Sequence, residues 1–142
     1  MSPSALANND PGCGVPAASD VFGTVKLLRE GLPVGCFLSL SQAVGLKEKD
    51  LALLVGISPS TMARRKKAGA FTLQEGERVL RYIRVYEQAV ELFGGDAPAA
   101  RRWLTKPNKL LEDKTPYEFA ATEAGARFVA EVIGRLEHGV FS

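Results

Sequence analysis

The fold of this chain is decided by residues 49–65, which read KDLALLVGISPSTMARR. In this stretch a glycine separates two short helical segments, and Ala52, Gly56 and Met62 follow one another at spacings of four and six residues. A helix-turn-helix needs a small residue where its helices cross, a glycine in the tight turn, and apolar residues beneath the second helix. These three residues meet the requirements, so the sequence predicts a helix-turn-helix here.

The second helix of the motif is basic. From Lys47 to Phe71 the sequence has six basic and two acidic residues, whereas the whole chain has a net charge of only +2. Ser58 followed by Pro59 predicts an N-cap with proline in the first helical turn. Positive charge concentrated on one element favours a polyanionic partner. We therefore predict that the motif binds DNA through these side chains: Lys47, Lys49, Ser58, Ser60, Thr61, Arg64, Arg65 and Lys67.

The residue types on the second helix indicate different roles at the DNA. Hydroxyl groups early in the helix suit phosphate contacts at its positive end, and arginines further along can pair with guanine edges. Arg65 stands where this motif usually has an apolar contact, so the second helix is expected to dock imperfectly. The alternative interpretation is a pair of core helices joined by a glycine turn, with a solvated basic face.

The rest of the sequence predicts an all-α chain, because apolar residues recur every three or four positions and no β alternation or repeat is found. Thr72 with Glu75, and Thr115 with Glu118, have the spacing of capping boxes. Asp96 can cap a helix that carries Trp103. The other predicted helices lie at about residues 21–30, 35–44, 47–55, 58–68, 72–93 and 123–137.

Composition divides the chain into three predicted parts. Residues 1–19 are rich in proline and poor in large apolar side chains, which predicts a flexible tail. Residues 20–71 hold the helix-turn-helix domain, and residues 72–142 hold a long linking helix followed by a C-terminal domain. A mean hydropathy of −0.01 and the absence of a long apolar run argue against a membrane span or secretory signal. We therefore expect a cytoplasmic protein.

Few residues could carry catalysis or bind a metal. The sequence has one histidine, His138, and two cysteines, Cys13 and Cys36, which do not form a CxxC pair. This argues against a metal site or a disulfide framework, and it makes Cys36 a small core residue. The sequence also lacks a readable nucleophile–base pair, a carboxylate pair and a phosphate-binding glycine loop. We predict that the chain is not an enzyme and uses no metal or cofactor.

Several stretches besides the helix-turn-helix form an ordered set along the chain: Gly31–Pro33, Glu77–Arg81, Ala89–Gly94, Ala100–Leu104, Pro107–Asn108 with Leu110, Thr115–Pro116, Gly125 and Leu136–Ser142. With these stretches, the C-terminal third resembles the toxin-binding domain of Xre/MbcA/ParS-type antitoxins. The upstream part is similar to the Xre-like DNA-binding half of the same family. Together the resemblance covers about residues 24 to 142, and it is nearest to the Xre antitoxins that are partnered with RES-domain toxins.

The resemblance implies a function that the composition does not. It implies an antitoxin of a type II toxin–antitoxin system that binds a RES-type toxin and represses its own operon at an operator DNA. RES toxins are similar in fold to ADP-ribosyltransferases and deplete NAD, so the end of the antitoxin is expected to block the NAD pocket. We expect a homodimer, since helix-turn-helix proteins commonly read two half-sites. The expected toxin-binding residues are Trp103, Asn108, His138, Gly139, Val140, Phe141 and Ser142.

Two other interpretations stay open. The chain could be a plain helix-turn-helix transcriptional regulator whose C-terminal half only dimerises, or an interaction module whose motif no longer binds DNA. At single positions, Trp103 is also explained as a core anchor, and His138 as a residue that complements a helix dipole. Arg78, Arg81 and Arg84 recur every third residue, which we interpret as a solvated or dimer-facing stripe, with toxin contact as the lesser alternative.

Overall fold

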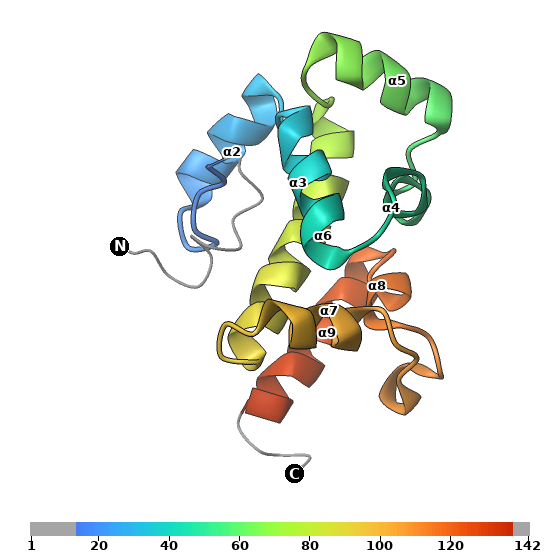
Figure 1. Ribbon diagram of the computed structural model, residues 1–142. Coiled ribbons are helices and arrows are strands. Elements are labelled where there is room, and N and C mark those ends of the chain that lie inside the picture. The colour runs from blue at the N-terminus through green and yellow to red at the C-terminus, as the bar shows by residue number, and fades with distance from the viewer. Residues whose placement is uncertain (1–13, 138–142) are drawn as a thin grey trace. The chain divides into compact units, whose positions relative to one another are not determined.

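The computed structural model describes residues 14–137. Every regular element in that range is helical (Figure 1), so the predicted all-α fold is confirmed. Between residues 14 and 137 the only strand-like pairings are two isolated bridges, Pro33 with Ala70 and Asn108 with Lys114. The elements are α2 (Val21–Glu30), α3 (Val34–Val44), α4 (Glu48–Val55), α5 (Pro59–Ala68), α6 (Leu73–Leu92), α7 (Ala97–Leu104), η1 (Lys109–Leu111), α8 (Pro116–Phe119) and α9 (Glu123–Glu137).

The helix boundaries follow local capping signals. The side chain of Asp96 accepts a hydrogen bond from the Ala99 N–H at 3.1 Å and begins α7. Thr115 and Glu118 form the predicted capping box of α8. Helices α3, α4 and α5 each end at a glycine in the left-handed region, where an L side chain would be strained: Gly45, Gly56 and Gly69. The sequence therefore marks where most helices begin and end.

The chain divides into two compact units, and the division falls inside α6, between Leu80 and Arg81. The N-terminal unit has its own apolar core, in which the rings of Phe37 and Phe71 meet edge to face with centroids 6.1 Å apart. The described part of the C-terminal unit has a separate core. Its largest fully buried side chains are Tyr82, Ile83, Tyr86, Leu104, Leu111 and Tyr117.

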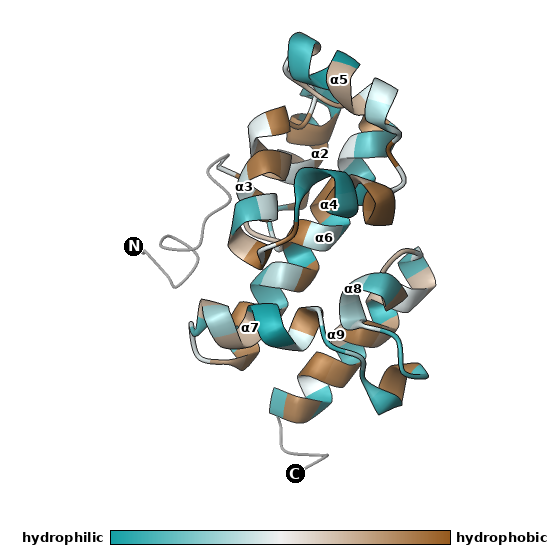
Figure 2. Cartoon of the chain, turned by 45° about the vertical axis from the view of Figure 1, so that its right-hand side comes forward, coloured by the Kyte–Doolittle hydropathy of each residue, from teal (hydrophilic) through white to brown (hydrophobic). Residues whose placement is uncertain are grey.

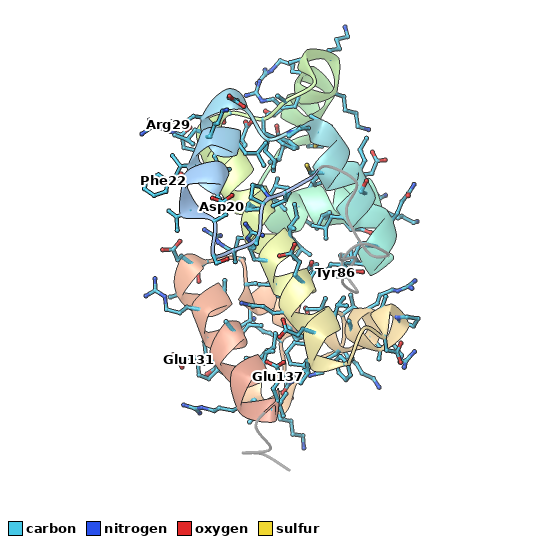
Figure 3. The ribbon with its side chains drawn as sticks, turned by 90° about the vertical axis from the view of Figure 1, so that its left-hand side faces the viewer. Asp20, Phe22, Arg29, Tyr86, Glu131 and Glu137 are labelled. Atoms are coloured by element: carbon cyan, nitrogen blue, oxygen red, sulfur yellow. The ribbon has the colours of Figure 1, made fainter. Side chains whose placement is uncertain are left out.

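Helix α2 is less buried than its apolar spacing suggests. None of its residues is buried, and Val21, Phe22 and Val25 are 62%, 91% and 41% exposed. Figure 3 shows the Phe22 ring projecting away from α2 into solvent. Apolar periodicity identifies the helix correctly here, but it does not predict that the apolar face is covered, because coverage depends on what else packs against it.

Cys36 differs from its prediction. It is fully buried on α3, as a core residue should be, but its sulfur is in a disulfide bond. The expectation that the chain has no disulfide is therefore wrong. The sequence's other cysteine, Cys13, lies outside the described residues. Disulfide pairing depends on the separation of the two cysteines in the fold and not on sequence spacing, so the lack of a CxxC pair could not decide the matter.

Two kinds of feature are absent from residues 14–137. No helix in this range is long and apolar enough to cross a membrane. No cluster of three or more His, Cys, Asp or Glu side chains in the same range has a geometry that could hold a metal ion.

Candidate functional site

Helices α4 and α5 form the predicted helix-turn-helix. Gly56 ends α4 with φ 83°, and the N–H groups of Gly56 and Ile57 both donate to the Ala52 carbonyl at 2.9 Å. Ser58 then begins α5, because its hydroxyl accepts a hydrogen bond from the Thr61 N–H at 3.2 Å. Met62, on α5, is 6% exposed and marks the buried side of that helix. The turn between the two helices is thus fixed by backbone and cap hydrogen bonds.

The N-terminal turn of α5 presents a group of hydroxyls. The Ser58 hydroxyl lies 3.0 Å from that of Thr61 and 3.3 Å from that of Ser60, and both serines are exposed. Pro59 lacks an N–H, but the other early amides of α5 point toward the same end. This turn combines hydroxyl donors with the positive end of a helix dipole, which is an arrangement suited to a phosphate group.

Exposed cations follow this turn. Figure 2 shows hydrophilic residues along much of α5, which has no acidic residue. Arg64 is exposed, and its Nη2 lies 3.3 Å from the Thr61 hydroxyl. Lys67 is exposed near the end of the same helix, and Lys47 and Lys49 are exposed at the start of α4. These cations, with the hydroxyl turn, make up the surface that the sequence assigned to DNA.

Arg65 is held differently from these neighbours. Its Nε and Nη2 donate to the two carboxylate oxygens of Glu75 at 2.6 and 2.9 Å, and the two side chains are 22% and 12% exposed. Two of the guanidinium nitrogens are thus engaged within the chain. The set of DNA contacts that we propose below therefore leaves out Arg65, although sequence spacing alone included it. Lys66, next to it, pairs with Glu48 on α4.

Glu75 joins this ion pair to the start of α6. One of its oxygens accepts the Thr72 N–H at 3.0 Å, and the Thr72 hydroxyl accepts the Glu75 N–H at 3.3 Å. The predicted capping box is therefore confirmed. The hydrogen bonds from Arg65 lower the pKa of the Glu75 carboxyl to about 2, with the Thr72 N–H acting in the same direction and burial opposing it. The carboxylate thus stays ionised through the neutral range.

The sequence suggested a solvated or dimer-facing stripe, but Arg78 and Arg81 both donate hydrogen bonds within the chain. Arg78 donates from Nε to the Val55 carbonyl at 2.9 Å, which satisfies a carbonyl at the C-terminal end of α4. Arg81 donates from Nη1 to the Ala121 carbonyl at 3.2 Å, just after α8. Arg84 forms an ion pair with Glu87 at 3.1 Å. The acceptors of Arg78 and Arg81 could not be predicted from the sequence, because they lie 23 and 40 residues away along the chain.

In the C-terminal unit two tyrosines are linked reciprocally. Tyr82 on α6 donates its hydroxyl to the Tyr117 carbonyl at 3.2 Å, and Tyr117 on α8 donates to the Tyr82 carbonyl at 2.9 Å. Their rings meet edge to face with centroids 4.9 Å apart. Burial raises the pKa of Tyr82 to about 12, so both hydroxyls remain donors at neutral pH. This pair anchors α8 to the second half of α6.

The residues expected to bind a toxin fall into two groups. Trp103 is half-buried on α7, and Asn108 caps η1, since its Oδ1 accepts the Leu110 N–H at 2.9 Å. Asn108 therefore has the structural role that a turn residue requires. The remaining five, His138, Gly139, Val140, Phe141 and Ser142, lie outside the described residues. The structure thus places only Trp103 and Asn108 of the expected set.

An apolar groove lies over α8 and α9 in the same unit. It has a volume of about 540 Å³, and the rings of Phe119 and Phe128 line it with centroids 5.8 Å apart. Phe128 is 36% exposed, although the apolar period of α9 predicts it in the core. Gly125 lines the same groove, and α9 approaches the backbone of Phe119 on α8 closely there. Nothing in the sequence marked this groove.

Each of the two parts of the chain matches a family of known protein domains. Residues 24–84 match the Antitoxin Xre-like helix-turn-helix domain, and residues 88–139 match the Antitoxin Xre/MbcA/ParS C-terminal toxin-binding domain. A relative named Antitoxin Xre from Yersinia enterocolitica is 38% identical, over 91% of this chain and 87% of its own. A second Antitoxin Xre, from Photorhabdus laumondii, is 37% identical, over 82% and 79%.

Proposed function

This chain belongs to the Xre antitoxin family, and from that premise we propose that it is the antitoxin of a type II toxin–antitoxin system. The observation that carries the proposal is the presence in one chain of an Xre-like helix-turn-helix domain and a toxin-binding domain. An antitoxin acts by occupying its partners, so it needs no catalytic group of its own. It would act in the cytoplasm, where it would meet operator DNA and the toxin.

We propose that the helix-turn-helix binds operator DNA through the exposed face of α5. Ser58, Ser60 and Thr61 would contact phosphates at the start of the helix, where hydroxyls and the helix dipole favour an anion. Arg64 and Lys67 extend the positive surface along the helix. Lys47 and Lys49, which are exposed at the start of α4, would neutralise phosphates beside it. A homodimer would present two such faces to two half-sites.

Operator binding is tested with a duplex from the region upstream of the chain's own gene. Arg64→Ala should weaken binding by about 1–3 kcal/mol if the arginine reads a guanine, with loss of preference at one base pair. Lys67→Ala should instead reduce the salt slope by about one unit, as expected for one phosphate contact. Arg29→Ala, which removes an exposed cation from α2, is the matched control and should change neither. If all variants bound the duplex like the parent, the motif would have a structural role and would not contact the DNA.

For the C-terminal half we propose a RES-type toxin as the partner. Such a toxin depletes NAD, and the simplest inhibition is to close its NAD pocket with the end of the antitoxin. The sequence after Glu137 is suited to this role in composition, because a glycine, Gly139, precedes two apolar residues, Val140 and Phe141. Trp103 and Asn108 would contact the toxin outside its pocket.

Neutralisation is tested by co-expressing the chain with the toxin encoded beside it, while growth, NAD level and co-purification are measured. The full chain should restore growth and NAD and form a stable complex. Deletion of Gly139–Ser142 should abolish protection, whereas Phe22→Ser, which alters an exposed aromatic residue on α2, should not. If the deletion variant still protects the cells, the proposed blocking of the NAD pocket is refuted. A harmless neighbour that does not bind would favour a plain transcriptional regulator.

A further inference from the structure

The connection between the recognition helix α5 and helix α6 is short and tied at several points. Gly69 ends α5 with φ 89°, and its carbonyl accepts the Val34 N–H at 3.0 Å. The Phe71 N–H donates to the Leu32 carbonyl at 3.0 Å, and the Phe71 ring is buried. These contacts hold the backbone of the connection. They do not by themselves fix the rotation of α5 about its own axis, which decides the residues that face outward.

The buried Met62 turns one side of α5 toward the core, and the Arg65–Glu75 pair adds a directional side-chain constraint on that rotation. The Glu75 carboxylate accepts three N–H donors, namely Nε and Nη2 of Arg65 and the backbone N–H of Thr72. Because the Thr72 contact sets the Glu75 side chain against the first turn of α6, its conformational freedom is small. A two-point contact between guanidinium and carboxylate planes is directional. The side of α5 that carries Arg65 is therefore turned toward α6.

The contrast between Arg64 and Arg65 follows from this orientation. Arg64 is the adjacent residue, about 100° further around the helix, and it is exposed. Arg65 has 22% of its side chain exposed and two of its nitrogens in the ion pair. If Arg65 turned outward to reach DNA, it would leave a largely buried carboxylate without its partner, which is unfavourable. Of these two arginines, the structure offers Arg64 to an external partner.

We propose that Arg65 and Glu75 are positioning residues for DNA binding: their pairing sets the rotation of α5 and thereby the presentation of Arg64 and the hydroxyl turn. The proposal rests on the proposed operator binding. It assigns Arg65 a role through helix placement, where the sequence assigned it a contact with DNA. It also makes Glu75, an acidic residue on another helix, a determinant of affinity for a polyanion.

The test compares Arg65→Met, Glu75→Gln and the double variant, with Arg64→Ala as the contact control. Each single change breaks the pair. The double variant removes the uncompensated charge, and its glutamine can still accept the Thr72 N–H in a capping box. If loosening α5 lowers its binding-competent fraction to about a tenth, each single variant binds the upstream duplex about tenfold more weakly. The affinity of the double variant for the duplex should lie within about threefold of the parental affinity.

The salt dependence separates the two roles of arginine. Arg65→Met should keep the parental salt slope, whereas a lost phosphate contact would reduce it by about one unit. A double variant that stays as weak as Arg65→Met, or single variants that bind like the parent, would overturn the proposal. Should Arg65→Met fail to fold, Arg65→Lys replaces it, because lysine keeps the charge but cannot make the two-point contact.

A second readout does not depend on DNA. Amide hydrogen exchange of residues 62–68 should be faster in each single variant and return toward the parental rate in the double variant. If the parent binds no duplex but this exchange pattern appears, the proposed operator binding fails while the positioning role of the pair stands. If the parent binds and exchange is the same in all variants, the positioning role fails while operator binding stands.

Discussion

Replacing Glu75 by glutamine should make the protein less stable at neutral pH and remove part of its sensitivity to acid. The carboxylate accepts two hydrogen bonds from Arg65 and one from Thr72, and these favour its ionised form. Glutamine resembles the protonated acid in size and shape. The variant should therefore behave at every pH as the parent does when Glu75 is protonated.

The size of the effect follows from the pKa of Glu75, which is lowered from 4.5 to about 2 in the folded chain. Lowering the pKa of the Glu75 carboxyl from 4.5 to about 2 corresponds to roughly 3 kcal/mol of folding free energy. The pair is partly solvated, so we expect about 1–2 kcal/mol. Because the folded pKa is depressed, this stabilisation is complete above the unfolded pKa. It is lost as the pH falls from about 4.5 through about 2.

The assay is urea unfolding followed by circular dichroism, for parent and variant, at several values between about pH 7 and about pH 2. The difference in unfolding free energy should be constant above about pH 5 and should close toward pH 2. Glu77→Gln removes an exposed carboxylate from the same helix and is the control. The reasoning is refuted if the difference for Glu75→Gln does not change with pH, or is no larger than the difference for the control.

Further predictions concern the C-terminal unit. Gly125→Ala should destabilise the chain by more than about 2 kcal/mol, because a Cβ there would lie 1.8 Å from the Phe119 carbonyl oxygen. Gly134→Ala, on the same helix with no atom within 4 Å of the added Cβ, should instead stabilise it by up to about 1 kcal/mol, and equal changes in Tm would contradict this account. Tyr117→Phe should cost about 1–2 kcal/mol in urea unfolding, since it removes the buried hydrogen bond to the Tyr82 carbonyl, and an unchanged midpoint would count against that bond.

The sequence predicts those local features that depend on residues three or four positions apart. The N-cap at Ser58 and the capping box of Thr72 with Glu75 are pairs of this kind, and both are confirmed. Helical periodicity predicted the all-α fold for the same reason. The exposed cations of α5 could also be identified, because Arg64 and Lys67 lie on a helix whose apolar face is marked by Met62.

The contacts that organise the site could not be predicted, because their partners lie on different helices. Arg65 meets Glu75 across ten residues, and Arg78 meets Val55 across 23. Spacing shows that a residue is charged and helical, but it does not show which helix faces it. Phe128 shows the same limit for apolar residues: its place in the period of α9 is regular, yet the ring lines an open groove.

The division of the chain inside α6 bears on how such proteins could exchange parts during evolution. Glu75 and Arg78, which hold the recognition helix and the end of α4, belong to the same helix as Tyr82, which anchors α8. A recombination event in the loop before α6 would separate α5 from the residues that hold it. Productive exchange of operator specificity between relatives should therefore occur within α6, after Arg78, where the breakpoint must preserve the helical phase.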